Sequence, residues 1–409
     1  MNNVSWLKEK LKYCRKPKTP FILFDLSAVE HNYKIIQRYI KNAKIFFAVK
    51  SNHHTRILQK LIALGSCFEV ASGGELKMLI KLRVNPEKIS FSNPVKNIAD
   101  IKLAYSYGVR LFVYDSLCEL MKLKKYAPES KGIIRLNVRY LFTNLKIGSM
   151  PFLGIKKDEA LDLLLHSLKL EYYTAGITFH VGSLTVNPII WRKVILYARD
   201  FFIQAKKIGC QLEILNLGGG FPSTAQLSIK NPSKTGPEYL YKFINNEINK
   251  RFFHSRPVII VEPGVGLVAN AGILIASVIC IAKRGKDIFV HIDVGSHNGL
   301  GYFFNQFPVY IIKQKLSQNN ILMQCAVNKL KDSEKIIGKE NYKKNSNLSA
   351  VEDCYIIDPT CDANLVMSLK GNIECNLGDW LCFEGRGAYS NVLCSEYNGM
   401  PRPRIIFKE

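Results

Sequence analysis

The chain has 409 residues, of which 47% are hydrophobic and 11% aromatic. This composition excludes a disordered chain and suits two domains, one of which can be a large barrel. The formal net charge is +24, but the lysines are spread along the whole chain, and no zinc-finger motif, RNP motif or basic arm interleaved with aromatics accompanies them. We therefore interpret the charge as a lysine-rich surface and expect no nucleic acid partner.

The cysteines and the N-terminus bear on the compartment. The 11 cysteines are scattered without a CxxC pair, which favours reduced thiols over a disulfide framework. The first residues, MNNVSWLKEKLKYCRKPK, lack an apolar segment of the kind found in secretory signals. The uncharged run Val265–Ala282 is short for a membrane helix and contains Gly and Asn, so we expect two buried strands separated at Asn270. The sequence thus favours a cytoplasmic protein without a membrane partner.

In chain order, short apolar runs rich in β-branched and aromatic residues alternate with helix-like segments. The runs are Ile45–Val49, Cys67–Ala71, Ile89–Ser92, Leu111–Tyr114, Ile133–Val138, Gly176–Val181, Leu212–Leu217 and Val258–Glu262. The helical segments are Thr55–Leu64, Glu75–Leu82, Ile98–Tyr107, Ser116–Tyr126, Lys157–Leu168, Pro188–Ile208 and Glu238–Arg251. Such alternation implies parallel strands with right-handed crossovers. We predict a (β/α)8 TIM barrel over residues 25–265.

After residue 265 strand-like runs follow one another without long helices. They are Gly272–Ile281, Asp287–Ile292, Val309–Ile312, Cys354–Ile357, Trp380–Phe383 and Arg404–Phe407. We predict an antiparallel, β-sandwich-like domain formed by residues 1–24 and 266–409, with an exposed loop in the Lys-, Asn- and Ser-rich stretch Lys313–Leu348.

Polar residues recur at the ends of the predicted barrel strands, where barrel enzymes place their active sites. They are Lys50, Glu69, Arg135, His180, Ser183, Gly218, Gly219, Gly220 and Glu262. Each has an ordinary structural explanation on its own, such as a solvated lysine or a tight glycine loop. Together they supply an amine, an aromatic base, a buried carboxylate and bare backbone N–H groups that can cradle a phosphate. This set suits a phosphorylated pyridine aldehyde better than a metal, because no cluster has zinc-ligand spacing.

The order and spacing of several motifs resemble one enzyme family. The motifs are AVKSN, EVASGGEL, FHVGS, NLGGGFP, VEPG, PTCD and GDWLCFEGRGAYS, and the likeness extends from Thr19 to the end of the chain. They resemble the fold-type III pyridoxal-phosphate decarboxylases, which include ornithine, diaminopimelate and arginine decarboxylases and relatives that act on carrier-bound amino acids. The resemblance implies pyridoxal 5'-phosphate (PLP) as cofactor and decarboxylation of an amino acid at its α-carboxylate.

The resemblance also implies a role for each matching residue. Lys50 would carry the cofactor, Glu262 would pair with its pyridine nitrogen, and His180 would stack on its ring. The phosphate would be held by Ser183, Gly218–Gly220, Gly264 and the hydroxyl of Tyr389. Glu69 and Arg135 would lie near the ring.

Two adjacent residues of the PTCD motif match substrate-side positions of the family. Cys361 would protonate the carbanion after carbon dioxide leaves, and Asp362 would contact the substrate. In the family these residues reach the barrel of a partner subunit, so the resemblance implies a homodimer with shared active sites. An acid that grips the distal amine in ornithine decarboxylases aligns here with Tyr310.

The sequence also departs from the family pattern. Val265 replaces the arginine of EPGR, which removes one phosphate contact, and Leu365 replaces a second acid after Asp362. The substrate therefore stays open between a diamino or basic amino acid and a carrier-tethered one. Two further alternatives are an inactive relative that acts by binding a partner, and a racemase that keeps the cofactor.

Overall fold

The computed structural model describes residues 17–142, 152–223, 236–301, 309–312, 323–324, 353–370 and 375–408. These residues form two compact units. One is Asp25–Ala271, and the other joins Phe24 and the residues before it to Gly272 and the residues after it. The chain therefore passes from one unit to the other twice, and each unit has a core of its own.

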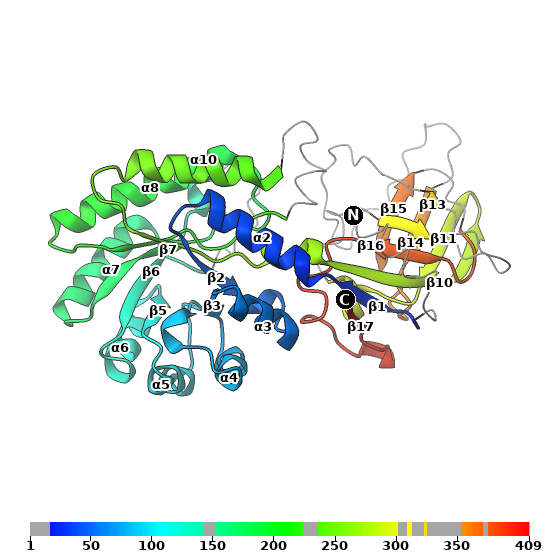
Figure 1. Ribbon diagram of the computed structural model, residues 1–409, viewed down its shortest axis with the longest axis horizontal. Helices are drawn as coiled ribbons and strands as arrows, with labels where there is room; N and C mark the ends of the chain where they lie inside the picture. Colours follow the sequence, from blue (N-terminus) through cyan, green and yellow to red (C-terminus); the bar gives the residue numbers. More distant parts are fainter. Residues whose placement is uncertain are drawn as a thin grey trace. The chain divides into compact units, whose positions relative to one another are not determined.

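The first unit is built on a closed barrel of parallel strands, as predicted (Figure 1). The strands, in barrel order, are β2 (Lys44–Ala48), β3 (Cys67–Val70), β4 (Ile89–Phe91), β5 (Leu111–Tyr114), β6 (Lys131–Leu136), β7 (Thr174–Phe179), β8 (Ile214–Asn216) and β9 (Val258–Val261). Pairing of β2 with β9 closes the barrel. A buried cluster on these strands includes Phe46, Val113, Ile133 and Ile260. Burial on both sides explains why the strands read as continuous apolar runs.

Helices surround the barrel (Figure 1). They are α2 (Leu26–Tyr39), α3 (Thr55–Ala63), α4 (Gly73–Lys81), α5 (Ile98–Tyr107), α6 (Leu117–Tyr126), α7 (Lys157–Lys169), α8 (Pro188–Lys207) and α10 (Gly236–Arg251). The sequence pattern missed α2, which begins after Asp25, whose side chain accepts a hydrogen bond from the Ser27 N–H. Helix α2 packs against α3, α10 and the short α11 (Val265–Val268). It thus covers the seam between the last strand and the first.

The run that was expected to form two buried strands instead begins with helix. Residues 265–271 form α11 and the 3-10 turn η4 (Ala269–Ala271) within the barrel unit, and only from Gly272 does the chain form a strand. The Asn32 side chain of α2 donates to the Leu267 carbonyl and to the Asn270 amide oxygen, which fixes this segment as helical turns. Among the described residues no helix is long and apolar enough to cross a membrane.

The second unit is a β domain with a mixed sheet. Its strands are β1 (Phe21–Phe24), β10 (Gly272–Arg284), β11 (Asp287–Ile292), β12 (Val309–Ile312), β13 (Met323–Gln324), β14 (Asp353–Ile357), β15 (Leu365–Lys370), β16 (Trp380–Phe383) and β17 (Arg404–Phe407). Most pairings are antiparallel, as expected. However, β1 pairs with β17 and β11 pairs with β14 in parallel, so the sheet is mixed rather than antiparallel throughout. Apart from β13, the predicted loop Lys313–Leu348 lies outside the described residues.

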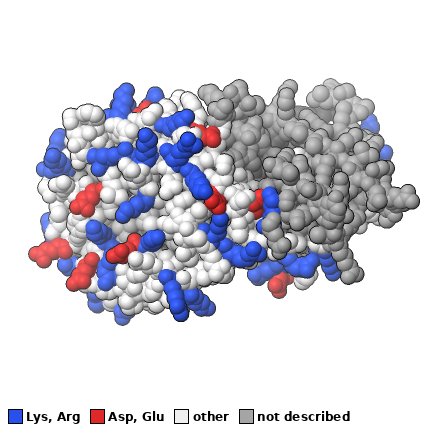
Figure 2. All heavy atoms as spheres, viewed as in Figure 1, with Lys and Arg blue, Asp and Glu red and all other residues white. Residues whose placement is uncertain are grey.

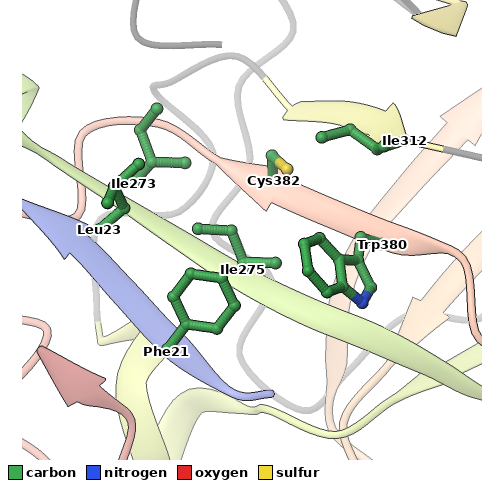
Figure 3. Packing of buried hydrophobic residues seen from close by; sticks show 7 residues of the cluster. All are labelled: Phe21, Leu23, Ile273, Ile275, Ile312, Trp380 and Cys382. Carbon is green, nitrogen blue, oxygen red and sulfur yellow. The ribbon is translucent and has the colours of Figure 1, made fainter. Parts of the chain in front are cut away.

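The core of the β domain gathers strands from both ends of the chain. Figure 3 shows side chains of β1, β10, β12 and β16 packed together: Phe21, Leu23, Ile273, Ile275, Ile312, Trp380 and Cys382. The Phe21 ring meets Trp380 edge to face, with ring centroids 5.7 Å apart. Beside this cluster the Lys408 N–H donates to the Phe24 carbonyl at 2.8 Å. The N-terminal strand is therefore part of the C-terminal domain.

The surface of the barrel unit is rich in basic side chains. Figure 2 shows lysines and arginines spread over its visible face, with acidic side chains between them. On this face the basic side chains are spread among acidic ones and do not gather in one patch.

Candidate active site

Lys50 and Glu69 form an ion pair at the ends of two neighbouring barrel strands. Lys50 lies in the 3-10 turn η1 (Val49–Ser51) directly after β2, and Glu69 lies on β3. The Lys50 Nζ is 3.5 Å from the Glu69 Oε2; the Lys50 side chain is 50% exposed, whereas that of Glu69 is 2% exposed. The ammonium offsets the cost of burying the carboxylate, and its exposed side leaves the amine accessible to a bound molecule.

Glu262 follows β9 and is held by two donors. The Ser92 hydroxyl and the Asn216 amide both donate to its Oε1, at 2.9 and 2.7 Å. Burial, and after it the nearby Glu69, raises the pKa of Glu262, while the two donors and Lys50 favour the charged form. A carboxylate oriented in this way is suited to pair with a cationic group such as a protonated ring nitrogen.

Ser92 and Asn216 were not among the predicted site residues. Ser92 follows β4 directly and its hydroxyl lies 3.0 Å from that of Ser90, while Asn216 is the last residue of β8. Both obey the rule that identified the other residues, since polar groups at the C-terminal ends of barrel strands face one mouth. Their signal in the sequence was weak because Ser and Asn are also common in turns.

His180 follows β7 and is held as a neutral ring. The Gly182 N–H donates to its Nδ1 at 3.0 Å, so the proton of the neutral ring is on Nε2. Burial, followed by the charges of Arg135 and Lys50, lowers the pKa of His180 to about 3. An uncharged ring at this position suits stacking better than proton transfer.

Three glycines after β8 bring the backbone close to the neighbouring loops. Gly218 and Gly220 have φ angles of +63° and +93°. A Cβ at Gly218 would lie 1.9 Å from the Phe179 carbonyl oxygen, and one at Gly220 would lie 2.3 Å from that of Gly182. Only glycine fits such contacts, and the resulting bare backbone is the type of loop that binds phosphate.

The loop after β9 closes against the same region. The Glu262 N–H donates to the Gly218 carbonyl at 2.8 Å. A Cβ at Gly219 would lie 3.5 Å from the His180 Nε2, and one at Gly264 would lie 2.9 Å from the Ser51 Cβ. The turns after β2, β7, β8 and β9 therefore converge, and this convergence brings together most of the predicted barrel residues.

Ser183 and Arg135 complete the predicted barrel set. Ser183 is exposed on the loop after β7, between Gly182 and Leu184, which both have positive φ angles. Arg135 lies on β6; burial lowers its pKa, while Glu262, Asp115 and Glu69 favour its charged form. These positions are compatible with the predicted roles, which remain predictions.

The β domain holds the remaining predicted residues. Cys361 and Asp362 are exposed in the turn after β14, and the Asp358 Oδ1 shapes this turn by accepting hydrogen bonds from the Thr360 and Asn364 N–H groups. The Cys361 thiol donates to the Asn398 Oδ1 at 3.4 Å. The thiol therefore has a fixed hydrogen-bond partner that the sequence did not reveal.

The two tyrosines lie elsewhere in the β domain. Tyr310, on β12, pairs with Cys382 of β16 and packs against the hydrophobic cluster of Figure 3. Its predicted contact with the substrate remains a prediction. Tyr389 follows β16 with a φ angle of +62°. Its predicted phosphate contact remains a prediction.

Comparison with known proteins agrees with this geometry. The family model described as "Pyridoxal-dependent decarboxylase, pyridoxal binding domain" matches residues 26–269. The chain belongs to this family. It is 29% identical to the lysine/ornithine decarboxylase of Selenomonas ruminantium over 98% of this chain and 93% of the relative. It is 29% identical to the ornithine decarboxylase of Rattus norvegicus over 95% and 80%.

A solved structure extends the likeness to both units. The crystal structure of SrLDC in complex with PLP and cadaverine matches 98% of this chain and 93% of its own, with a TM-score of 0.77 and 26% identity. The chain is thus a PLP-dependent amino-acid decarboxylase.

The residues present fit the cofactor. The glycine turn after β8 suits its phosphate, the accessible Lys50 amine suits its aldehyde, and Glu262 suits its ring nitrogen. Among the described residues no group of His, Cys, Asp and Glu could hold a metal ion. The donor set therefore matches a phosphorylated pyridine.

Proposed function

We propose that this enzyme removes the α-carboxylate, as carbon dioxide, from a basic amino acid with a distal amine, of the lysine or ornithine type. The observation that carries the proposal is the convergence of Lys50, Glu69, His180 and Glu262 on one end of the barrel. Relatives that act on lysine and ornithine, similar over nearly the whole chain, and the exposed carboxylate of Asp362 support the choice of substrate.

The barrel residues divide the work. PLP, when bound, supplies an electron sink for the pair released as the carboxylate leaves. Lys50 would hold it through the side-chain amine, and Glu69 would stabilise the ammonium form of that amine whenever the amine is not joined to the cofactor. The neutral His180 ring would stack on the pyridine. Glu262 would pair with the ring nitrogen and keep it protonated, with Ser92 and Asn216 fixing the orientation of the carboxylate.

The β-domain residues act on the substrate. We propose that the Cys361 thiol donates the proton that replaces the carboxylate, and that its hydrogen bond to the Asn398 amide oxygen orients the thiol. Asp362 binds the distal ammonium. Because Cys361 and Asp362 are exposed in the single chain, we propose a homodimer in which they complete the partner's site. The described cysteines are free thiols, which supports a reducing compartment such as the cytoplasm.

The test compares Lys50→Ala with Lys44→Ala, which changes the exposed lysine at the start of the same strand. Wild type and Lys44→Ala should retain PLP, seen as visible absorbance, and borohydride should fix it on Lys50. Both should release carbon dioxide from carboxyl-labelled lysine or ornithine, whereas Lys50→Ala should release none. Undiminished release by Lys50→Ala would refute the assignment.

The same assay separates the alternatives. A protein that never retains PLP would be a regulatory relative, and one that exchanges the α-proton without releasing carbon dioxide would be a racemase.

Mixing the inactive Lys50→Ala and Cys361→Ala variants should restore activity if two subunits share each site. A carrier-tethered substrate is the second candidate; it rests on the net charge of +24, which would suit an acidic carrier protein. Turnover of free lysine or ornithine would argue against it.

A further inference from the structure

Asp362 is engaged by two aromatic residues that no sequence motif singled out. The Tyr397 hydroxyl donates to its Oδ1 at 3.3 Å. The His297 Nε2 lies 3.9 Å from its Oδ2, beyond hydrogen-bond distance. The rings of His297 and Tyr397 are in contact, with centroids 4.8 Å apart. One carboxylate oxygen is thus bonded to a tyrosine, and the other faces a ring without a hydrogen bond to it.

The position of Tyr397 is fixed by the backbone around it. Tyr397 begins the 3-10 turn η7 (Tyr397–Gly399), and its N–H donates to the Ser395 hydroxyl. The Ser395 N–H and hydroxyl both donate to the His297 carbonyl. The next residue, Asn398, accepts from both the N–H and the thiol of Cys361. Tyr397 is therefore part of a connected network, although its side chain is exposed.

This arrangement should bind a distal ammonium and a distal guanidinium with different affinities. A guanidinium binds a carboxylate best through two parallel N–H···O bonds, which require both oxygens. An ammonium is a point charge that needs only one. The nearby Asp362 carboxylate raises the pKa of Tyr397, so its hydroxyl stays protonated and keeps its bond to Oδ1. The Asp362 side chain is 45% exposed, so a single-point partner can reach Oδ2.

We propose that Tyr397 is a specificity-determining residue: by occupying Oδ1 of Asp362, it favours substrates with a distal ammonium over substrates with a distal guanidinium. The inference deepens the proposed function and rests on the role proposed there for Asp362. Tyr397 acts through Asp362 and does not take part in bond breaking, so it is a positioning residue.

The experiment uses Tyr397→Phe, which removes the hydroxyl and keeps the ring. A matched control is Tyr105→Phe in the barrel, because the Tyr105 hydroxyl also donates to an exposed carboxylate, Glu129, at 3.3 Å. With PLP-loaded protein, kcat and KM are measured for lysine, ornithine and arginine. Binding of cadaverine and of agmatine, a diamine and an aminoalkyl guanidine, is measured by calorimetry.

Wild type should prefer lysine or ornithine to arginine. In Tyr397→Phe that preference should fall about tenfold, as expected for one hydrogen bond to a charged group. The change should appear in KM for arginine and in agmatine affinity, as a change in the ratio between substrates and not as an equal loss for all three. Tyr105→Phe should match wild type, and a purely structural role of Tyr397 would not change the ratio between two substrates.

Several outcomes would overturn the inference. They are a wild-type preference for arginine, an unchanged ratio in Tyr397→Phe, or an equal change in Tyr105→Phe. The proposed function fails separately: selective diamine binding that depends on Tyr397, without release of carbon dioxide from any basic amino acid, would refute decarboxylation and leave the selectivity standing. Release of carbon dioxide with an unchanged ratio between the substrates in Tyr397→Phe would support decarboxylation and refute the role of Tyr397 in selectivity.

Discussion

The residues around Glu262 in the barrel and those around Asp362 in the β domain hold their carboxylates in different ways. Glu262 is held at strand ends by two hydrogen bonds to one oxygen, and burial raises its pKa. Asp362 lies in an exposed turn, and among the described contacts it accepts one hydrogen bond, from Tyr397. Two donors at the strand ends hold the Glu262 carboxylate in one orientation, whereas the Asp362 side chain, 45% exposed, is open to a further partner. On the proposed function, the barrel group would tune the cofactor, and the exposed turn would supply the substrate contact of Asp362 and the proton of Cys361.

Loss of one partner of a buried ion pair in the barrel should give the largest effect. Lys96 and Glu119, with side chains 0% and 4% exposed, form an ion pair at 2.8 Å. Lys96 also donates to the Val113 and Asn93 carbonyls, next to Ser92. We expect Glu119→Gln to lower the free energy of unfolding by about 3–5 kcal/mol, because it leaves a buried ammonium without its counter-charge.

Urea denaturation with and without the substitution measures this loss. Glu30→Gln is the matched control, since Glu30 pairs with Lys34 and Lys60 at the surface of the same unit. It should cost much less, because solvent screens an ion pair at the surface. A similar loss in both variants would mean that burial does not separate the two kinds of pair. The pKa of Lys96 is lowered by burial to about 8, so the penalty should shrink as the pH rises above that value and the amine becomes neutral.

A smaller effect is expected at Glu262. In Ser92→Ala one of the two donors to its Oε1 is lost, and a hydrogen bond to a charged group contributes about 1.5–3 kcal/mol. We expect kcat to fall by roughly tenfold or more, with the protein still folded and loaded with PLP. Ser90→Ala is the control, because Ser90 contacts Ser92 but makes no hydrogen bond to Glu262 among the described contacts. Equal losses in both variants would assign Ser92 to packing rather than to the carboxylate.

The barrel was predictable because its signals are local, and the missed parts depend on tertiary contacts. Buried parallel strands make apolar runs such as Leu111–Tyr114, which the structure reproduces to the residue. Helix α2 was missed although Asp25 supplies a cap. It precedes the first barrel strand, whereas the predicted helices all lie after a strand. The parallel pairing of β1 with β17 joins strands from opposite ends of the chain, so no local sequence pattern predicts it. Tyr397 and His297 meet Asp362 only through loops whose course the sequence pattern does not specify.

The smallest expected effect concerns the Cys361 thiol. Asn398 has a φ angle of +54° and accepts hydrogen bonds from both the N–H and the thiol of Cys361. Asn398→Gly keeps a residue suited to that backbone and removes only the acceptor. We expect kcat to fall a few-fold, about 1 kcal/mol for a neutral hydrogen bond, with an unchanged melting temperature. Asn42→Gly is the matched control, because Asn42 in the barrel unit has a φ angle of +60°. If Asn398→Gly destabilised the protein more than Asn42→Gly, its role would be to hold the turn, and the exposed region would be as rigid as the barrel.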